Sequence, residues 1–131
     1  MALITSISIS LFIIAGVAKA IMDTLQFHYP DSIFSKLNPK FWNPDLSWTN
    51  KYSDVSKLKL KTLIWNIPYP VFLTDAWHLF QFIFLNSLFL GAFGMIVIDV
   101  HSFIGAIAIT ILNRVAFGTA FYVFYNKFLL H

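Results

Sequence analysis

The residues best suited to chemistry are acids and histidines near two apolar stretches. Lys19 and Asp23 are spaced i, i+4, and His28 follows shortly after them. Asp75 and His78 are spaced i, i+3. Residues three or four apart lie on one face of a helix, so each pair is expected to make a side-chain contact. If both stretches end at the same membrane surface, the acids and histidines meet there.

Such a group supports two kinds of chemistry. Carboxylates and imidazoles can bind a divalent metal that keeps an open water position. The candidate metal ligands are Asp23, His28, Asp75 and His78. Without a metal, Asp75 can orient His78 for acid/base catalysis, and Lys19 is a further candidate catalytic residue. Haem binding by the histidines ranks below the metal site. The alternative without chemistry is a set of interfacial ion pairs, since the D-x-x-H spacing is common.

A second polar group falls inside an apolar run. Arg114 lies at the middle of residues 102–126. At 1.5 Å of rise per residue, Asn113, Asn86 and Ser10 are expected at the same depth. Three explanations stay open: these neighbours and water satisfy the arginine, an acid of a partner subunit pairs with it, or it lines an anion path.

The composition shows what kind of protein must position these residues. The 131 residues are 58% hydrophobic and only 11% charged, whereas soluble domains carry about 25% charged residues. This excludes an ordinary soluble enzyme and a nucleic-acid-binding module, and the abundance of Phe, Ile and Leu excludes disorder. The chain has no cysteine, which excludes disulfides, thiolate metal sites and cysteine catalysis.

We therefore expect one all-α membrane domain with three spans. A spanning helix needs about 20 mostly apolar residues, and the chain offers three such runs, at about 2–22, 71–98 and 102–128. The link between the last two is short, so they form an antiparallel pair. Glycines at 91 and 94 could kink the second span.

The lysines predict the orientation. Six of them lie between the first two spans and one, Lys127, lies at the C-terminal end of the third, whereas the link near residue 100 has none. The positive-inside rule then places the central segment and the C-terminus in the cytoplasm, and the N-terminus outside, in an inner (cytoplasmic) membrane. Lys57, Lys59 and Lys61 are the candidate residues for binding lipid headgroups.

The central segment, about residues 23–70, differs in composition from the spans. It holds all five prolines and nine aromatic residues. Prolines exclude a long helix, and aromatic rings with lysines favour the membrane–water interface. A short helix is expected at 31–37, and a strand at 57–63 pairing with 47–52. Small residues such as Gly16, Ala20, Ala116 and Ala120 allow close helix contact, within one chain or between chains.

Three stretches carry a resemblance to a known group of proteins. Lys19 to Tyr29, Trp48 to Tyr52 and Phe72 to Gln81 resemble a group of small bacterial integral membrane proteins with no assigned activity. The resemblance covers about the first two-thirds of the chain and implies a membrane location. It implies no reaction.

Two function classes follow. The first is a non-enzymatic subunit or scaffold that binds membrane lipid and a protein partner or a second copy. The second is a membrane-embedded hydrolase, metal-dependent or acid/base, that acts on a lipid at the cytoplasmic interface. No specific catalytic signature is present, so the non-enzymatic interpretation comes first.

Overall fold

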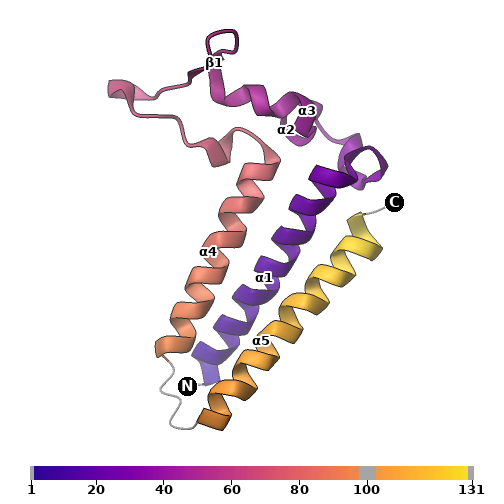
Figure 1. The fold of residues 1–131 in the computed structure, drawn as a ribbon, viewed down its shortest axis with the longest axis vertical. Helices are drawn as coiled ribbons and strands as arrows, with labels where there is room; N and C mark the ends of the chain where they lie inside the picture. Colours follow the sequence, from indigo (N-terminus) through magenta and orange to yellow (C-terminus); the bar gives the residue numbers. More distant parts are fainter. Residues whose placement is uncertain (1, 98–102, 130–131) are drawn as a thin grey trace.

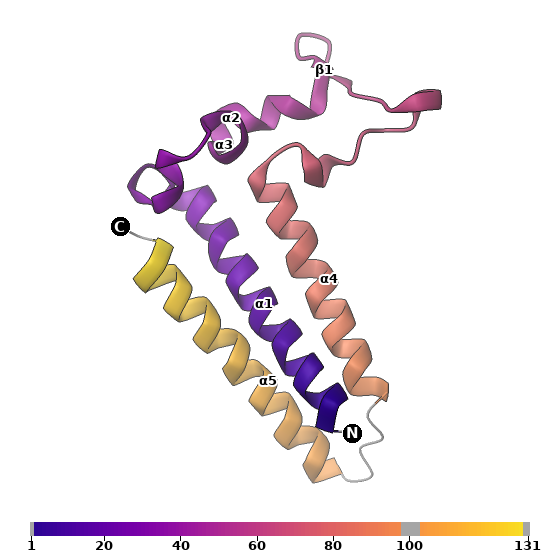
Figure 2. The ribbon, with the colours of Figure 1, turned by 180° about the vertical axis from the view of Figure 1, so that it is seen from behind.

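The chain is mostly helical, and its long helices match the expected spans. The computed structural model describes residues 2–97 and 103–129. The long helices are α1 (Ala2–Phe27), α4 (Ala76–Val97) and α5 (Phe103–Val123), and α5 continues into the π-helical turn η6 (Phe124–Leu129). Within the described ranges, three helices are long and apolar enough to cross a membrane. α1 packs against both α4 and α5 (Figures 1 and 2).

The helix boundaries differ from the predicted ones in two places. α1 ends at Phe27 and not near residue 22, because the next proline is Pro30 and polar groups along its last turns bond within the helix. α4 begins at Ala76 and not at 71, because Val71–Leu73 forms a separate 3₁₀ turn, η5, after Pro70. Residue 102, where the third span was expected to begin, lies outside the described residues.

The segment between α1 and α4 contains only short elements, as its prolines predict. Pro39 and Pro44 occupy first positions of one-turn helices, where the missing N–H costs nothing. The Asn38 and Asn43 side chains cap these turns by accepting from the backbone N–H two residues on. In order, the short elements are η1 (Tyr29–Asp31), η2 (Ile33–Lys36), α2 (Pro39–Trp42), α3 (Pro44–Ser47) and η3 (Trp48–Lys51). The short helix expected at 31–37 is thus replaced by 3₁₀ turns.

A β-hairpin follows these turns. Strands β1 (Tyr52–Asp54) and β2 (Lys59–Leu60) are antiparallel, with Tyr52 opposite Leu60. The expected hairpin is therefore present with shorter strands: the first begins at 52, since residues 47–51 are helical, and the second spans 59–60 in place of 57–63. The chain then makes a second tight reversal that contains the 3₁₀ turn η4 (Ile64–Asn66) before it reaches α4.

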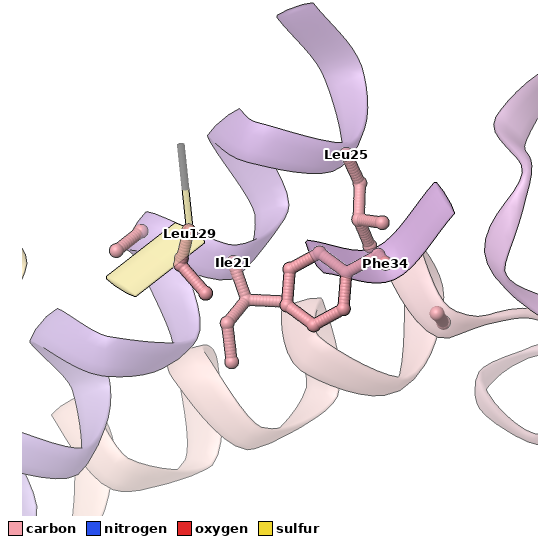
Figure 3. Packing of buried hydrophobic residues seen from close by; sticks show 6 residues of the cluster. Ile21, Leu25, Phe34 and Leu129 are labelled. Atoms are coloured by element: carbon pink, nitrogen blue, oxygen red, sulfur yellow. The ribbon is translucent and has the colours of Figure 1, made fainter. Parts of the chain in front are cut away.

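A small core joins the short elements to the helix ends. The buried cluster lies where the end of α1, η2, the start of α4 and η6 meet (Figure 3). Its members are Ala20, Ile21, Leu25, Phe34, Ala76 and Leu129. Phe34 stacks on Trp42 with ring centroids 4.8 Å apart, which extends the cluster into α2. Part of the aromatic segment is thus folded onto the helices.

Glycines set the distance between helices. A Cβ at Gly16 would lie 2.5 Å from the Phe117 carbonyl oxygen of α5 and 3.2 Å from the Ala120 Cβ. The small residues predicted on these helices therefore serve a contact within one chain. Gly91 and Gly94 face α1, and α4 is one continuous helix across both. These two glycines permit close packing in place of the expected kink.

Candidate functional site

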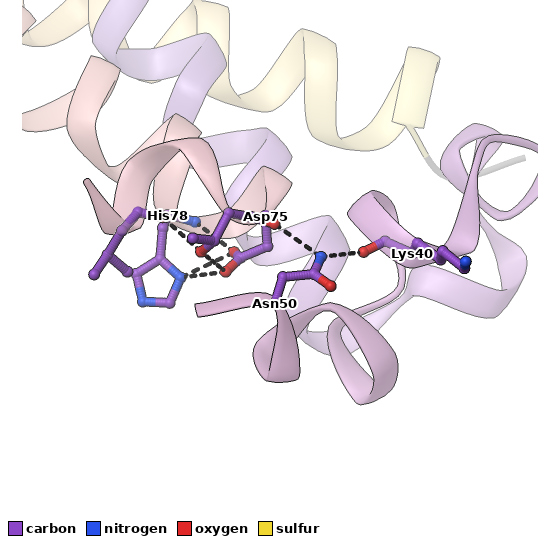
Figure 4. A network of polar contacts seen from close by, with 6 residues as sticks. Lys40, Asn50, Asp75 and His78 are labelled. Carbon is purple, nitrogen blue, oxygen red and sulfur yellow. Dashed lines mark hydrogen bonds and ion pairs between the residues drawn. The ribbon is translucent and has the colours of Figure 1, made fainter. Parts of the chain in front are cut away.

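A short polar contact at the start of α4 joins Asp75 and His78. His78 Nδ1 lies 2.7 Å from Asp75 Oδ2 and 2.9 Å from Asp75 Oδ1 (Figure 4). Asp75 is only 2% exposed, and the His78 side chain is 28% exposed. The predicted i, i+3 contact is thus present. A carboxylate on Nδ1 holds the imidazole in one orientation and leaves Nε2 as the working nitrogen.

The sequence at the start of α4 explains this geometry. Asp75 precedes the first helical residue, and its Oδ1 accepts from the His78 backbone N–H at 3.0 Å, as an N-cap side chain does. The Thr74 hydroxyl donates to Asp75 Oδ2 at 3.1 Å. The Asn50 amide donates to the Thr74 carbonyl at 2.9 Å and also to the Lys40 carbonyl, so it ties the helix start to the preceding turns (Figure 4).

The pair borders a cavity of about 350 Å³ between the start of α4, the end of α1 and α3. The lining residues are Gln26, Pro44, Asp45, Ser47, Trp48, Asp75, Trp77 and His78. His78 Nε2 has no hydrogen-bond partner among the residues that the structure describes.

Lys19 and Asp23 form a separate ion pair on α1. They border a different cavity, of about 400 Å³, together with Arg114 and residues of α5. Within residues 2–97 and 103–129, no group of three or more His, Cys, Asp and Glu side chains is close enough to hold a metal ion. The predicted set of Asp23, His28, Asp75 and His78 is therefore not assembled as ligands, and Lys19 does not join the Asp75–His78 pair.

Two members of the predicted cluster around Arg114 bond within their own helices. The Asn86 amide donates to the Phe82 carbonyl and the Ser10 hydroxyl to the Ser6 carbonyl, both one turn back on their own helices. Short polar side chains in apolar surroundings commonly bond to such a carbonyl. Neither residue is a hydrogen-bond partner of Arg114 among the described residues.

Asn113 and Arg114 instead border a cavity of about 430 Å³ whose other walls are apolar. Asn113 is 2% exposed, its amide N–H lies 2.8 Å from Met95 Sδ, and its Oδ1 has no partner within the described part of the chain. Arg114 Nη1 lies only 3.0 Å from where a Cβ of Gly118 would be. The guanidinium therefore extends along α5 toward the end that carries Lys127.

Ser47, Trp48 and Gln26 border the Asp75–His78 cavity but are not among the predicted site residues. Ser47 falls in the strand expected at 47–52, and Gln26 falls beyond the expected end of the first span. Gln26 and Trp48 lie in stretches that carry the resemblance, which is the signal that the sequence offers for them. No family model, curated protein or solved structure matches the chain. The interpretation of the site therefore depends on its geometry.

Proposed function

We propose that this multi-pass membrane protein binds anionic lipid at the end where α1 finishes and α4 begins. The observation that carries the proposal is the surface of residues 52–69, which we call the lysine hairpin. It exposes Lys57, Lys59 and Lys61 beside exposed apolar side chains. Each lysine near an anionic membrane surface contributes about 1 kcal/mol of attraction.

The second reversal of the lysine hairpin, at residues 64–66, is its tip and holds its most exposed apolar side chains. Ile64 is 76% and Trp65 is 89% exposed. The tip is held rigidly, since the Leu63 N–H donates to the Ile67 carbonyl at 2.7 Å and the Tyr69 N–H to the Lys61 carbonyl at 2.9 Å. An indole ring is favoured at the headgroup level of a bilayer, where its apolar body and its N–H both find partners.

Trp65 adopts a backbone conformation that bulky residues avoid, with φ 62°. Asn66 follows with φ 60°, so a tight reversal places the indole at the outermost point of the hairpin. Strain of about 1 kcal/mol or more at such a residue is retained only where surrounding structure holds it. An exposed, strained tryptophan beside lysines fits contact with headgroups better than contact with water.

A fluorescent label at position 65 tests this proposal. The chain has no cysteine, so Trp65→Cys gives a single site for an environment-sensitive dye. In nanodiscs that contain phosphatidylglycerol we expect a blue-shifted emission and quenching by lipid-borne nitroxide. The same dye at Leu46→Cys, an exposed position in α3, serves as the control. Emission at position 65 that does not differ from this control in any lipid would overturn the proposal.

The orientation belongs to the same proposal. We place the lysine hairpin and the C-terminus in the cytoplasm and the N-terminus outside an inner membrane, because the lysines gather at that end. A cysteine at Lys57→Cys should then react with an impermeant maleimide only after the cells are opened. Labelling in intact cells would reverse the orientation.

The partner-binding part of the function depends on Arg114. No carboxylate among the described residues lies within 4.0 Å of its guanidinium. A charge near the bilayer centre needs a partner or a route to water, so we expect an acid of a partner transmembrane helix beside it. A photo-crosslinking residue at the neighbouring exposed Val115 should capture a helix with an intramembrane Asp or Glu, and Arg114→Leu should abolish the product. Capture that is unchanged by Arg114→Leu would contradict this pairing.

A second function, acid/base catalysis on a lipid, is favoured by the Asp75–His78 pair and its cavity. Asp75 holds Nδ1, and Nε2 serves as the base toward a bound molecule. Positioned acid/base groups contribute about 10²- to 10⁴-fold in rate. Conversion of nanodisc lipids, followed by mass spectrometry, should therefore fall at least about 100-fold in His78→Gln and be unaffected by His28→Gln. Equal turnover in wild type and His78→Gln would exclude this function.

A further inference from the structure

Ser47 is a nucleophile-bearing residue that neither the lipid-binding nor the acid/base proposal uses. It ends α3, and its backbone N–H donates to the Asn43 carbonyl at 2.8 Å, which fixes its position. The residue is 3% exposed and borders the same cavity as His78. Its hydroxyl has no hydrogen-bond partner among the described residues. A hydroxyl at a cavity wall that no described protein group engages is available to a molecule bound in that cavity.

Three side chains around this cavity match the parts of a nucleophilic hydrolase. Asp75 binds His78 Nδ1, His78 presents Nε2, and Ser47 supplies a hydroxyl to the same cavity. A serine, a base and a group that orients the base recur on unrelated folds, and are recognised by geometry and not by chain order. Ser47 and His78 are not hydrogen-bonded to each other in this structure. Such bonds are commonly long in the unliganded state and tighten in the complex with substrate.

We propose that Ser47 is the nucleophile of an acyl-transfer site, with His78 as the base and Asp75 as the residue that orients it. This inference rests on the second function proposed above, and it names the substrate class as an ester-linked membrane lipid. The cavity lies at the start of α4, where a candidate membrane span begins. The ester carbonyls of glycerolipids lie at that level, between headgroups and acyl chains. Pro44, Trp48 and Trp77 provide apolar wall for the start of an acyl chain.

The reaction proceeds in two balanced steps. Ser47 Oγ attacks the ester carbonyl carbon while its proton passes to His78 Nε2, and the tetrahedral intermediate expels the alcohol, which takes that proton. The product is an acyl ester on Ser47. Water then attacks this ester, gives one proton to His78 Nε2 and releases the fatty acid, and the proton returns to Ser47 Oγ. No oxidant, reductant or metal is consumed.

The developing negative charge on the carbonyl oxygen needs donors. Gln26, Trp48 and Trp77 border the cavity and carry side-chain N–H groups. Donors of this kind, aimed at the oxyanion, stabilise the transition state of acyl transfer. Asp75 does not contribute here, because a carboxylate only accepts hydrogen bonds, as it does from Thr74 and His78.

A fluorophosphonate probe tests the nucleophile directly. It reacts with an activated serine by forming a P–O bond to Oγ and releasing fluoride. With the full chain in nanodiscs we expect one adduct by intact mass, mapped to the peptide that contains Ser47. Ser47→Ala should remove the adduct and His78→Gln should lower its rate at least 100-fold. Ser35→Ala, at an exposed serine of η2, should leave it unchanged.

A second variant tests the role of Ser47 independently of whether Ser47→Ala folds. Ser47→Cys introduces the only cysteine, and we expect iodoacetamide to alkylate it at least 10-fold faster than in Ser47→Cys combined with His78→Gln, because the imidazole takes the thiol proton. A wild-type chain without an adduct, or an adduct independent of His78, would overturn the proposal. Lipid turnover that needs His78 but survives Ser47→Ala would overturn the role of Ser47 and leave the acid/base function standing.

Discussion

Asp75 makes two contacts with His78, and they demand different properties of its side chain. It caps α4 by accepting from the His78 backbone N–H, and it binds the imidazole of the same residue. An uncharged amide oxygen suffices for the cap, since Asn is as good an N-cap as Asp. Orienting and stabilising an imidazole that takes up a proton needs the carboxylate.

Substitutions at Asp75 should separate these two roles. Asp75→Asn keeps an N-cap acceptor, whereas Asp75→Ala removes it. We expect Asp75→Ala to lower the free energy of unfolding by about 1 kcal/mol more than Asp75→Asn. Both should lose His78-dependent activity. Chemical unfolding in detergent measures the first quantity, and equal stability of the two variants would show that the cap contributes nothing.

Asp54 provides a pH-dependent contact in the lysine hairpin. The Ser56 hydroxyl donates to its carboxylate at 2.7 Å, and this bond, with backbone N–H donation from Lys57 and Ser56, holds the pKa of Asp54 below its ordinary value of 3.8. A carboxyl with a lowered pKa in the folded state contributes stability above its unfolded pKa, and this stability is lost as the pH falls through the folded value. The turn between β1 and β2 should therefore lose stability only in acid.

An NMR titration of the Asp54 carboxyl carbon checks this expectation. The midpoint should lie below 3.8 in wild type and move toward that value in Ser56→Ala, because the hydroxyl is the largest cause of the shift. Ser53→Ala is the control, since its hydroxyl donates to the Lys59 carbonyl and not to Asp54. A midpoint unaffected by Ser56→Ala would contradict the assignment.

At the residue scale, spacing within one helix predicted contacts well and spacing between elements did not. Asp75 with His78, and Lys19 with Asp23, are paired as their separations of three and four residues require. The metal set needed residues from two elements to converge. Their convergence depends on the residue at which α1 ends and on how the following turns fold. The hydrophobicity pattern predicts neither of these. Ser47 was missed for the same reason.

At the scale of elements, apolar length predicted three spans, but helix starts required local chemistry. Residues 71–73 are as apolar as the helix that follows, and only Pro70 with the cap at Asp75 shows that α4 starts later. Contacts between helices depend on small residues, and the sequence does not show which residues of another helix each of them contacts. The structure pairs Gly16 of α1 with Phe117 and Ala120 of α5.

Substituting alanine for Gly16 and for Gly94 should show which of the two glycines packs tightly against the backbone of another helix. Gly16→Ala would place a methyl group 2.5 Å from the Phe117 carbonyl oxygen, which cannot move without shifting α5. Gly94→Ala would meet Ser8 side-chain atoms at 3.6 Å, an ordinary contact distance. We expect Gly16→Ala to cost about 1–3 kcal/mol of unfolding free energy and Gly94→Ala almost none. Equal effects in a detergent unfolding assay would mean that α1 and α5 are not packed through Gly16.

At the scale of the whole molecule, the polar residues Lys19, Asp23, Asn113 and Arg114 border neighbouring cavities beside α5. Arg114 borders both the cavity that contains Asn113 and the one that contains Lys19 and Asp23. The Arg114 guanidinium extends toward Gly118 and borders both cavities. It therefore reaches from the middle of α5 toward the end that carries Lys127. Composition alone indicated a membrane protein with few charges to explain. In the folded chain, Asp75 and His78 border one cavity, and Lys19, Asp23 and Arg114 border another beside α5.

Asn113 gives the sharpest test of what the polar residues beside α5 are for. Its buried Oδ1 has no partner among the described residues, and an unsatisfied buried acceptor costs about 1–3 kcal/mol. If the cavity beside it contains only lipid tails or empty space, Asn113→Leu removes this cost and should raise the free energy of unfolding by about 1 kcal/mol. Met95→Leu should lower it, because it takes away the sulfur that accepts from the Asn113 amide. A loss of stability in Asn113→Leu would instead mean that a donor, from a bound molecule or a partner helix, occupies the cavity in the membrane, and unfolding measured in nanodiscs and in lipid-free detergent would separate these two sources.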